Sequence, residues 1–99
     1  MRTLEEIKVQ LEALKPVIRK RFQVDTIGIF GSYSRRQQNE KSDVDLVVTL
    51  VEPNDFDLID LVALKYYLSR KLRAKVDVVL KRALKDEIKN GILQETIYV

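Results

Sequence analysis

The sequence predicts an α/β (α+β) fold in which a small mixed β-sheet is flanked by helices. The chain has 99 residues, a length typical of one compact domain, so we expect residues 1–99 to form a single unit. Segments with the three-to-four-residue apolar spacing of helices alternate with short, β-branched apolar runs typical of strands. This alternation favours helices packed on a sheet in one pair of layers.

The first predicted helix begins after Thr3, whose side chain can cap it together with Glu6 three residues later. Pro16 lies inside this helix and lacks a backbone donor, so we expect the helix to kink or restart there. The apolar positions recur at steps of three and four, which is typical of an amphipathic helix: Leu4, Ile7, Leu11, Leu14 and Ile18.

Two strands are predicted on either side of a polar segment. Residues 26–30 are β-branched and apolar, and they predict a buried strand that ends at Gly31. Residues 32–39 are polar and basic and are expected to include a short helix. Residues 43–50 predict the second strand.

The next predicted helix covers about residues 57–73, after a turn in which Asn54 or Asp55 can act as its N-cap. Its core-facing positions are expected to be Leu58, Leu61, Leu64, Leu68 and Leu72. Its outer side is expected to carry Lys65, Ser69, Arg70 and Arg73.

The end of the chain predicts a strand at residues 75–80 and a helix at about residues 85–95. The apolar tail at residues 96–99 has two interpretations. With the last helix it can dock a partner, or it can add an edge strand to the sheet or pack on the first helix.

Composition excludes several kinds of chemistry. The chain has no Cys and no His, so thiolate zinc sites, cysteine nucleophiles and Ser-His-Asp triads are ruled out. The net charge of +3 is small, and no apolar run is long enough for a membrane span, so we expect a cytoplasmic protein. Residues 41–60 contain one basic residue, Lys41, and six acids: Asp43, Asp45, Glu52, Asp55, Asp57 and Asp60.

Asp43 and Asp45 are the strongest candidates for chemistry. Residues i and i+2 of a strand point the same way, about 6–7 Å apart, where two carboxylates repel each other. A divalent cation reverses that repulsion, and hard oxygen ligands favour Mg²⁺ or Mn²⁺. Asp77 joins them if the third strand pairs beside the second. The alternative is that these acids are solvated and lie at strand ends or on an outer face.

Gly31 and Ser32 follow the first strand directly, where backbone amides and a hydroxyl can approach an anion. Arg35, Arg36 and Lys41 are near enough in sequence to bind phosphate groups. A Gly-Ser pair after a strand is also common as a plain turn, so its order and spacing with the acids carry the argument.

The residues Gly31-Ser32-Tyr33-Ser34-Arg35, followed by Ser42-Asp43-Val44-Asp45, resemble the signature of the DNA polymerase beta-like nucleotidyltransferase superfamily. The third acid of that pattern matches Asp77. The resemblance is closest to the minimal nucleotidyltransferase (MNT) domains and extends over nearly the whole chain. This sequence departs from the family after the aromatic position. The family usually has Ala, then Arg and Gly, whereas this chain has Ser34, Arg35 and Arg36, so the first and third positions differ.

The resemblance implies a polymerase-beta-type fold and a role for each site residue. Gly31 and Ser32 would hold the triphosphate of ATP, with Arg35 and Arg36 as further nucleotide-binding candidates. Asp43 and Asp45 would ligate two Mg²⁺ ions. Asp77 would complete the second metal site and help to deprotonate the acceptor.

The family also implies a partner. Minimal members pair with a HEPN-domain ribonuclease toxin, so the resemblance implies an antitoxin that transfers AMP to the toxin, on a tyrosine. We weigh two alternatives: a non-catalytic module that neutralises a partner by occlusion, and a transferase acting on RNA ends or small molecules. The sequence has no aromatic–basic interleaving that would support RNA binding, so we expect no direct binding to nucleic acid. The sequence is compatible with a homo-oligomer.

Overall fold

The computed structural model describes residues 2–99. Four strands form one mixed sheet in the order β3-β2-β1-β4. The sequence predicts a mixed sheet and the first three of these strands along the chain. The elements are α1 (Leu4–Phe22), β1 (Val24–Phe30), α2 (Gly31–Ser34), β2 (Val44–Leu50), α3 (Leu58–Leu72), β3 (Val76–Leu80), the 3₁₀ turn η1 (Lys81–Ala83), α4 (Asp86–Glu95) and β4 (Ile97–Tyr98).

The pairing of the strands determines which residues meet. β1 runs antiparallel to β2 and β4, whereas β2 and β3 are parallel because α3 carries the chain back across the sheet. In this register Asp45 of β2 lies between Phe30, at the end of β1, and Asp77 of β3. Three segments that are distant in sequence therefore meet at one end of the sheet.

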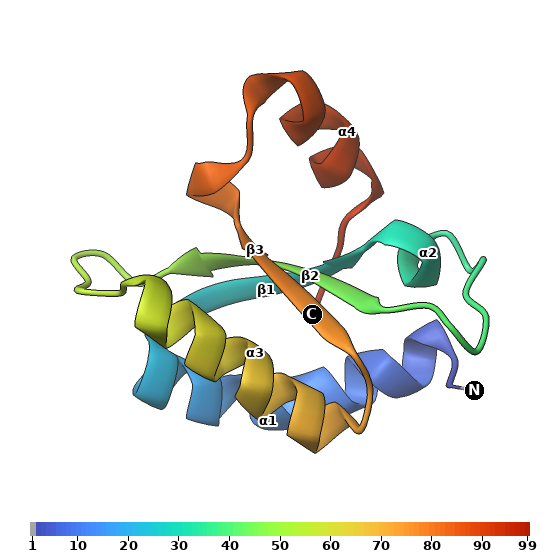
Figure 1. Cartoon of the computed structure of the whole chain (residues 1–99), viewed down its shortest axis with the longest axis horizontal. Coiled ribbons are helices and arrows are strands. Elements are labelled where there is room, and N and C mark those ends of the chain that lie inside the picture. Colours follow the sequence, from blue (N-terminus) through green and yellow to red (C-terminus); the bar gives the residue numbers. More distant parts are fainter. Residues whose placement is uncertain (1) are drawn as a thin grey trace.

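Helices α1 and α3 cover one face of the sheet, and α4 with η1 lies on the other side (Figure 1). The main core lies between the sheet and the α1–α3 layer, where alternate strand residues meet the apolar faces of both helices. By contrast, α4 has no buried residue. The fully buried side chains of the core include Ile7, Leu11, Ile18, Ile27, Ile29, Leu46, Leu64, Leu68 and Leu72.

Helix α1 begins as predicted, with the Thr3 hydroxyl accepting from the backbone of Glu6 and the Glu6 carboxylate accepting from the backbone of Thr3. The expectation that the helix restarts at Pro16 is wrong. The helix runs without interruption through Pro16 to Phe22. Packing of its apolar face on the core outweighs the loss of one backbone hydrogen bond.

Two expectations about α3 are corrected. Its N-cap is Asp57, which forms a capping box with Asp60, whereas Asn54 shapes the preceding turn through bonds with Val51 and Phe56. Leu58 does not reach the core and is 72% exposed, because its position four residues before the exposed Val62 places it on the outer side of α3.

The tail follows the edge-strand interpretation. Ile97 and Tyr98 pair with β1, and the Val99 amide donates to the Ile27 carbonyl at 3.0 Å. The tail is therefore part of the sheet, and partner docking by the last helix and this tail stays a prediction. Within residues 2–99, no helix is both long and apolar enough to cross a membrane.

Candidate active site

The sheet brings the predicted carboxylates to one face. Asp45 pairs directly with Asp77 in the parallel register, and Asp43 lies two residues before Asp45 at the start of β2. Their neighbours Val44 and Val76 are buried in the core under α1 and α3, so strand alternation places the acids on the opposite face. All three are partly exposed to solvent.

The field at this end of the sheet is negative. The pKa of Asp45 is raised above its usual value, first because burial disfavours the charged form and then because Asp77 and Asp43 lie nearby. Glu95 acts in the same direction, while the Arg35 guanidinium opposes it. The negative charge around Asp45 is therefore only partly compensated by the side chains present.

Gly31 lies directly against Asp45. A Cβ atom at Gly31 would collide with the Asp45 carboxylate, and the backbone there has φ +72°, which disfavours other residues. This glycine lets α2 start immediately beside the acids. Ser32 is the second residue of that helix and is partly exposed.

Glu95, at the end of α4, is a site residue that sequence reasoning missed. Its carboxylate accepts from the Gly31 amide at 3.1 Å and from Arg35 Nη1 at 2.8 Å. It therefore occupies two donors that were predicted to bind phosphate. No local pattern could reveal these contacts, because they join residues that are 64 and 60 positions apart in the sequence.

Lys65 of α3 was expected on the outer side of its helix, and this is corrected. Its Nζ atom lies 3.2 Å from Oδ1 of Asp77, and both side chains are partly exposed. Because α3 packs against β3, Lys65 lies close enough to the strand edge to reach Asp77 on it. This pairing supplies a positive charge at the edge of the carboxylate cluster.

The structure does not bring Arg36 to the carboxylates. Its guanidinium pairs with Glu5 of α1, with Nη2 and Oε2 2.7 Å apart, and lowers the pKa of Glu5 through this hydrogen bond. Arg36 has φ 55°, so the left-handed conformation suited to the family's usual glycine is kept here by an arginine. Only Arg35 of the two arginines faces the site.

A polar groove of about 460 Å³ reaches Asp43. It runs between the segment before β2 and the turn that joins α3 to β3. Lys41, predicted as a phosphate-binding candidate, lies along it beside Asp43. The other basic residues of its lining are Arg2, Arg73 and Lys75. An anionic molecule in this groove would meet several cations next to a carboxylate.

The donor set suits a hard divalent cation, although it does not enclose one unaided. Within residues 2–99, no three acidic side chains lie close enough together to form a ready-made metal cage. The three carboxylates nevertheless provide the oxygen ligands that Mg²⁺ prefers, and their negative charge is only partly compensated by nearby cations. Mg²⁺ commonly takes its remaining ligands from water and substrate phosphates, which agrees with an open cluster.

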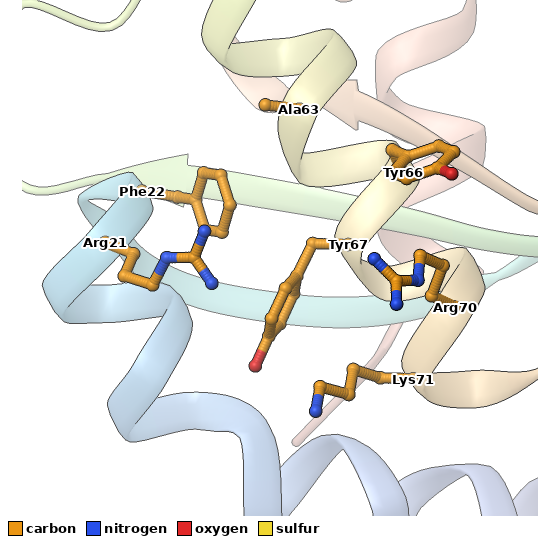
Figure 2. Close-up of a pocket in the computed structure, with 7 residues that line it drawn as sticks. All are labelled: Arg21, Phe22, Ala63, Tyr66, Tyr67, Arg70 and Lys71. Carbon is orange, nitrogen blue, oxygen red and sulfur yellow. The ribbon is translucent and has the colours of Figure 1, made fainter.

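A second cavity, of about 480 Å³, lies away from the acids between the end of α1 and α3 (Figure 2). The Arg21 guanidinium lies 5.1 Å from the centres of both the Phe22 and Tyr67 rings. Arg70 and Lys71 approach the tyrosines from the other side. The sequence analysis found no aromatic–basic interleaving, although Tyr66, Tyr67, Arg70 and Lys71 are close in sequence on α3; Arg21 and Phe22 join them from α1.

Comparison with known proteins gives a consistent result. Residues 11–99 match the family described as "Nucleotidyltransferase domain". The protein adenylyltransferase MntA of Thermococcus cleftensis is 43% identical over all of this chain and 98% of its own. A candidate protein adenylyltransferase of Methanocaldococcus jannaschii, MJ0128, is 42% identical over the full length of both chains.

Solved structures agree with the fold. A candidate minimal nucleotidyltransferase superposes with a TM-score of 0.81 at 31% identity, covering 97% of this chain and 95% of its own. A toxin–antitoxin complex with AMP-PNP has a TM-score of 0.74 at 24% identity, over 90% of this chain and 70% of that one. A complex of tri-AMPylated Shewanella oneidensis HEPN toxin with MNT antitoxin has a TM-score of 0.67 at 21% identity, over 92% and 69%. The last two similarities concern the fold alone.

Proposed function

The chain belongs to the nucleotidyltransferase domain family, and from this we propose that it transfers AMP from ATP to a hydroxyl group of a partner protein. Membership confirms the resemblance drawn from the Gly-Ser and Asp-x-Asp residues, and the chain is a nucleotidyltransferase. The observation that carries the finer proposal is the parallel register of β2 and β3, which sets Asp77 beside Asp45, the carboxylate that lies against Gly31.

In this proposal Asp43, Asp45 and Asp77 hold two Mg²⁺ ions. When bound, these ions supply charge neutralisation for the attacking and leaving oxygens. Ser32 binds the triphosphate, and the Gly31 amide and Arg35 add hydrogen bonds to it once they release the Glu95 carboxylate. Arg36 is left out of this set because it pairs with Glu5. Lys41 and the basic lining of the groove beside Asp43 provide further attraction for an anionic nucleotide.

The transfer is an in-line displacement at the α-phosphorus. The acceptor oxygen forms a bond to this phosphorus while the bond to the bridging oxygen of the β-phosphate breaks, and pyrophosphate leaves. The acceptor loses its proton, and we assign Asp77 as the carboxylate that helps to take it. The chain contains no His, so a carboxylate is the group best suited to act as base.

We propose a HEPN-domain toxin as the acceptor protein and a tyrosine as the modified residue, which makes the chain an antitoxin. The relatives named as protein adenylyltransferases support a protein acceptor. Two solved toxin–antitoxin complexes contain a chain of similar fold, and in one of them the toxin is an AMPylated HEPN protein. These complexes support the proposal of a HEPN-domain partner. Among residues 2–99, α4 and η1 lie on the carboxylate side of the sheet, and α4 has no buried residue, so we infer that a macromolecule can approach this face.

The test is transfer of label from α-³²P ATP, with Mg²⁺, to a candidate HEPN-domain partner, which is sought first among the genes beside that of this chain. We expect label on the partner, an added AMP mass on a tyrosine peptide, and loss of partner ribonuclease activity. Asp43→Asn with Asp45→Asn should abolish all three. The matched control Asp86→Asn, on the outer part of α4, should retain them.

Other outcomes select the alternatives. Full neutralisation of the partner by the double variant, without added mass, would mean that occlusion is the mechanism. Label on RNA ends or on a small molecule, but not on protein, would assign a different acceptor. In either case the assignment of a protein acceptor would be wrong.

A further inference from the structure

The outer side of α3 carries an exposed apolar stripe, defined here as Leu58, Ile59, Val62 and Tyr66. Their side chains are 72%, 78%, 60% and 67% exposed, respectively. Together with Ala63 they line a shallow groove of about 500 Å³ with no polar surface. Single exposed apolar residues are common on proteins, but a continuous patch on one helix marks a contact surface.

The two ends of α3 carry opposite charges. Exposed acids precede or begin the helix, including Asp55 and Asp57, whereas its last turn and the residue after it carry Arg70, Lys71 and Arg73. The basic end continues into the cavity that contains Arg21 and Tyr67 (Figure 2). Within residues 2–99, neither Arg21, Arg70 nor Lys71 has a carboxylate within ion-pair distance.

We propose that this stripe binds a second copy of the same chain, with the two α3 helices antiparallel about a two-fold axis near Val62. Leu58 and Tyr66 lie four residues to either side of Val62, so each would face the other across the axis. The same rotation carries the acidic end of one helix to the unpaired cations of the other. The stripe is therefore complementary to itself in both shape and charge.

Charge favours this occupant over an acidic or basic partner protein. A uniformly acidic segment would meet Asp55 and Asp57 at one end of the stripe, and a uniformly basic one would meet Arg70 and Lys71 at the other. A second copy in antiparallel orientation avoids both conflicts. Antiparallel helices also align their dipoles favourably.

The dimer would leave the carboxylate face free. Helix α3 lies on the side of the sheet opposite α4 (Figure 1). Asp45 is on the α4 side, because its neighbours Val44 and Leu46 are buried in the core under α1 and α3. Two copies joined through α3 therefore keep both candidate active sites open and directed away from each other. The proposal does not depend on the identity of the acceptor.

The test is sedimentation of the purified chain over a concentration series, in which the 11.6 kDa monomer should associate to twice that mass. Val62→Lys should weaken association by about a hundredfold, because it places two like charges at the axis. The matched control is Val9→Lys, on α1, where the side chain is 71% exposed but lies outside the stripe. It should leave the association unchanged.

A second variant uses the absence of cysteine from the chain. Val62→Cys should give a disulfide-linked dimer on mild oxidation, whereas Val9→Cys should stay mostly monomeric. A wild-type chain that remains monomeric up to about 1 mM would overturn the proposal. So would a dimer that Val62→Lys leaves intact, or a stripe that only the toxin partner occupies. Failure of AMP transfer would affect none of these measurements.

Discussion

The two faces of the sheet differ in chemistry, although the same strands form both. On the α1–α3 face, residues such as Leu46 and Val78 are buried in an apolar core. On the other face, the adjacent residues Asp45 and Asp77 are set side by side, where their charges oppose each other. In both β2 and β3, every second residue is apolar, packed in the core and stabilising. The acid between two such residues is destabilising.

The difference indicates what the carboxylate face is for. A face selected for stability alone would not retain an acid whose pKa is raised by burial and then by two neighbouring acids. The core face supplies the rigidity that holds these acids in register. Each prediction below separates the contributions of the two faces.

The largest effect is expected from Asp45→Asn. Loss of a metal-binding carboxylate should lower AMP transfer by about a thousandfold or more, since the ions provide several kcal/mol of charge stabilisation. The same change should raise the melting temperature of the metal-free protein, because it removes repulsion with Asp77. Label transfer and thermal unfolding measure the two effects. Unfolding of the variant would mean that Asp45 is structural.

Leu46→Ala tests the core face one residue along the same strand. Leu46 is fully buried, so the substitution should lower the free energy of unfolding by about 2–5 kcal/mol, measured in urea. Below the unfolding transition, the folded variant should keep its KM for ATP. A large rise in KM without loss of stability would break the proposed division between the faces.

The two arginines after α2 should now behave differently. Arg35→Ala should raise the KM for ATP by about tenfold to a hundredfold, the value of a charge-assisted hydrogen bond. Arg36→Ala should leave KM unchanged and shift the melting temperature slightly, since its side chain contacts Glu5 of α1. Equal effects on KM would place both arginines at the nucleotide.

Glu95→Gln should have a smaller effect and the opposite sign. Removing its charge releases Arg35 from an ion pair that is partly exposed, so affinity for ATP should rise by up to about fivefold. Calorimetric titration with ATP and Mg²⁺ measures this change. Weaker binding would show instead that Glu95 holds Arg35 in position for the nucleotide.

The smallest expected effect is a pH dependence. A raised pKa in the folded state means that folded Asp45 binds a proton more tightly than the unfolded chain does. The destabilisation from ionised Asp45 is therefore complete above its raised pKa and disappears as the pH falls below the usual value of 3.8. The stability difference between metal-free wild type and Asp45→Asn should shrink over that interval. A difference that grows on acidification would contradict the sign.

Local patterns predicted most of the fold. The capping box at Thr3, the apolar spacing of α1 and the alternation of Asp and Val in β2 each operate within a few residues, and each is present as expected. The same reasoning failed where tertiary packing decides. Pro16 is tolerated because the core holds α1, and Leu58 is exposed because it lies on the outer side of α3 with Val62.

The candidate site shows the same limit. Asp43, Asp45 and Gly31 could be selected from sequence because strand alternation and the Gly-Ser step are local features. The contacts of Glu95 with Gly31, and of Lys65 with Asp77, depend on how α4 and α3 pack, which no local spacing encodes. Arg36 was misplaced for a related reason, since its partner Glu5 lies on the first helix.

The parallel pairing of β2 with β3 also affects when the acids come together during folding. An antiparallel pair such as β1 and β2 can form from the segment that joins them, whereas β3 reaches β2 only after an entire helix has crossed the sheet. A chain folded only as far as β1 and β2 contains Asp43 and Asp45 without Asp77. On the proposed assignment, catalytic competence is therefore a late folding event, and partly folded copies are inert toward nucleotide.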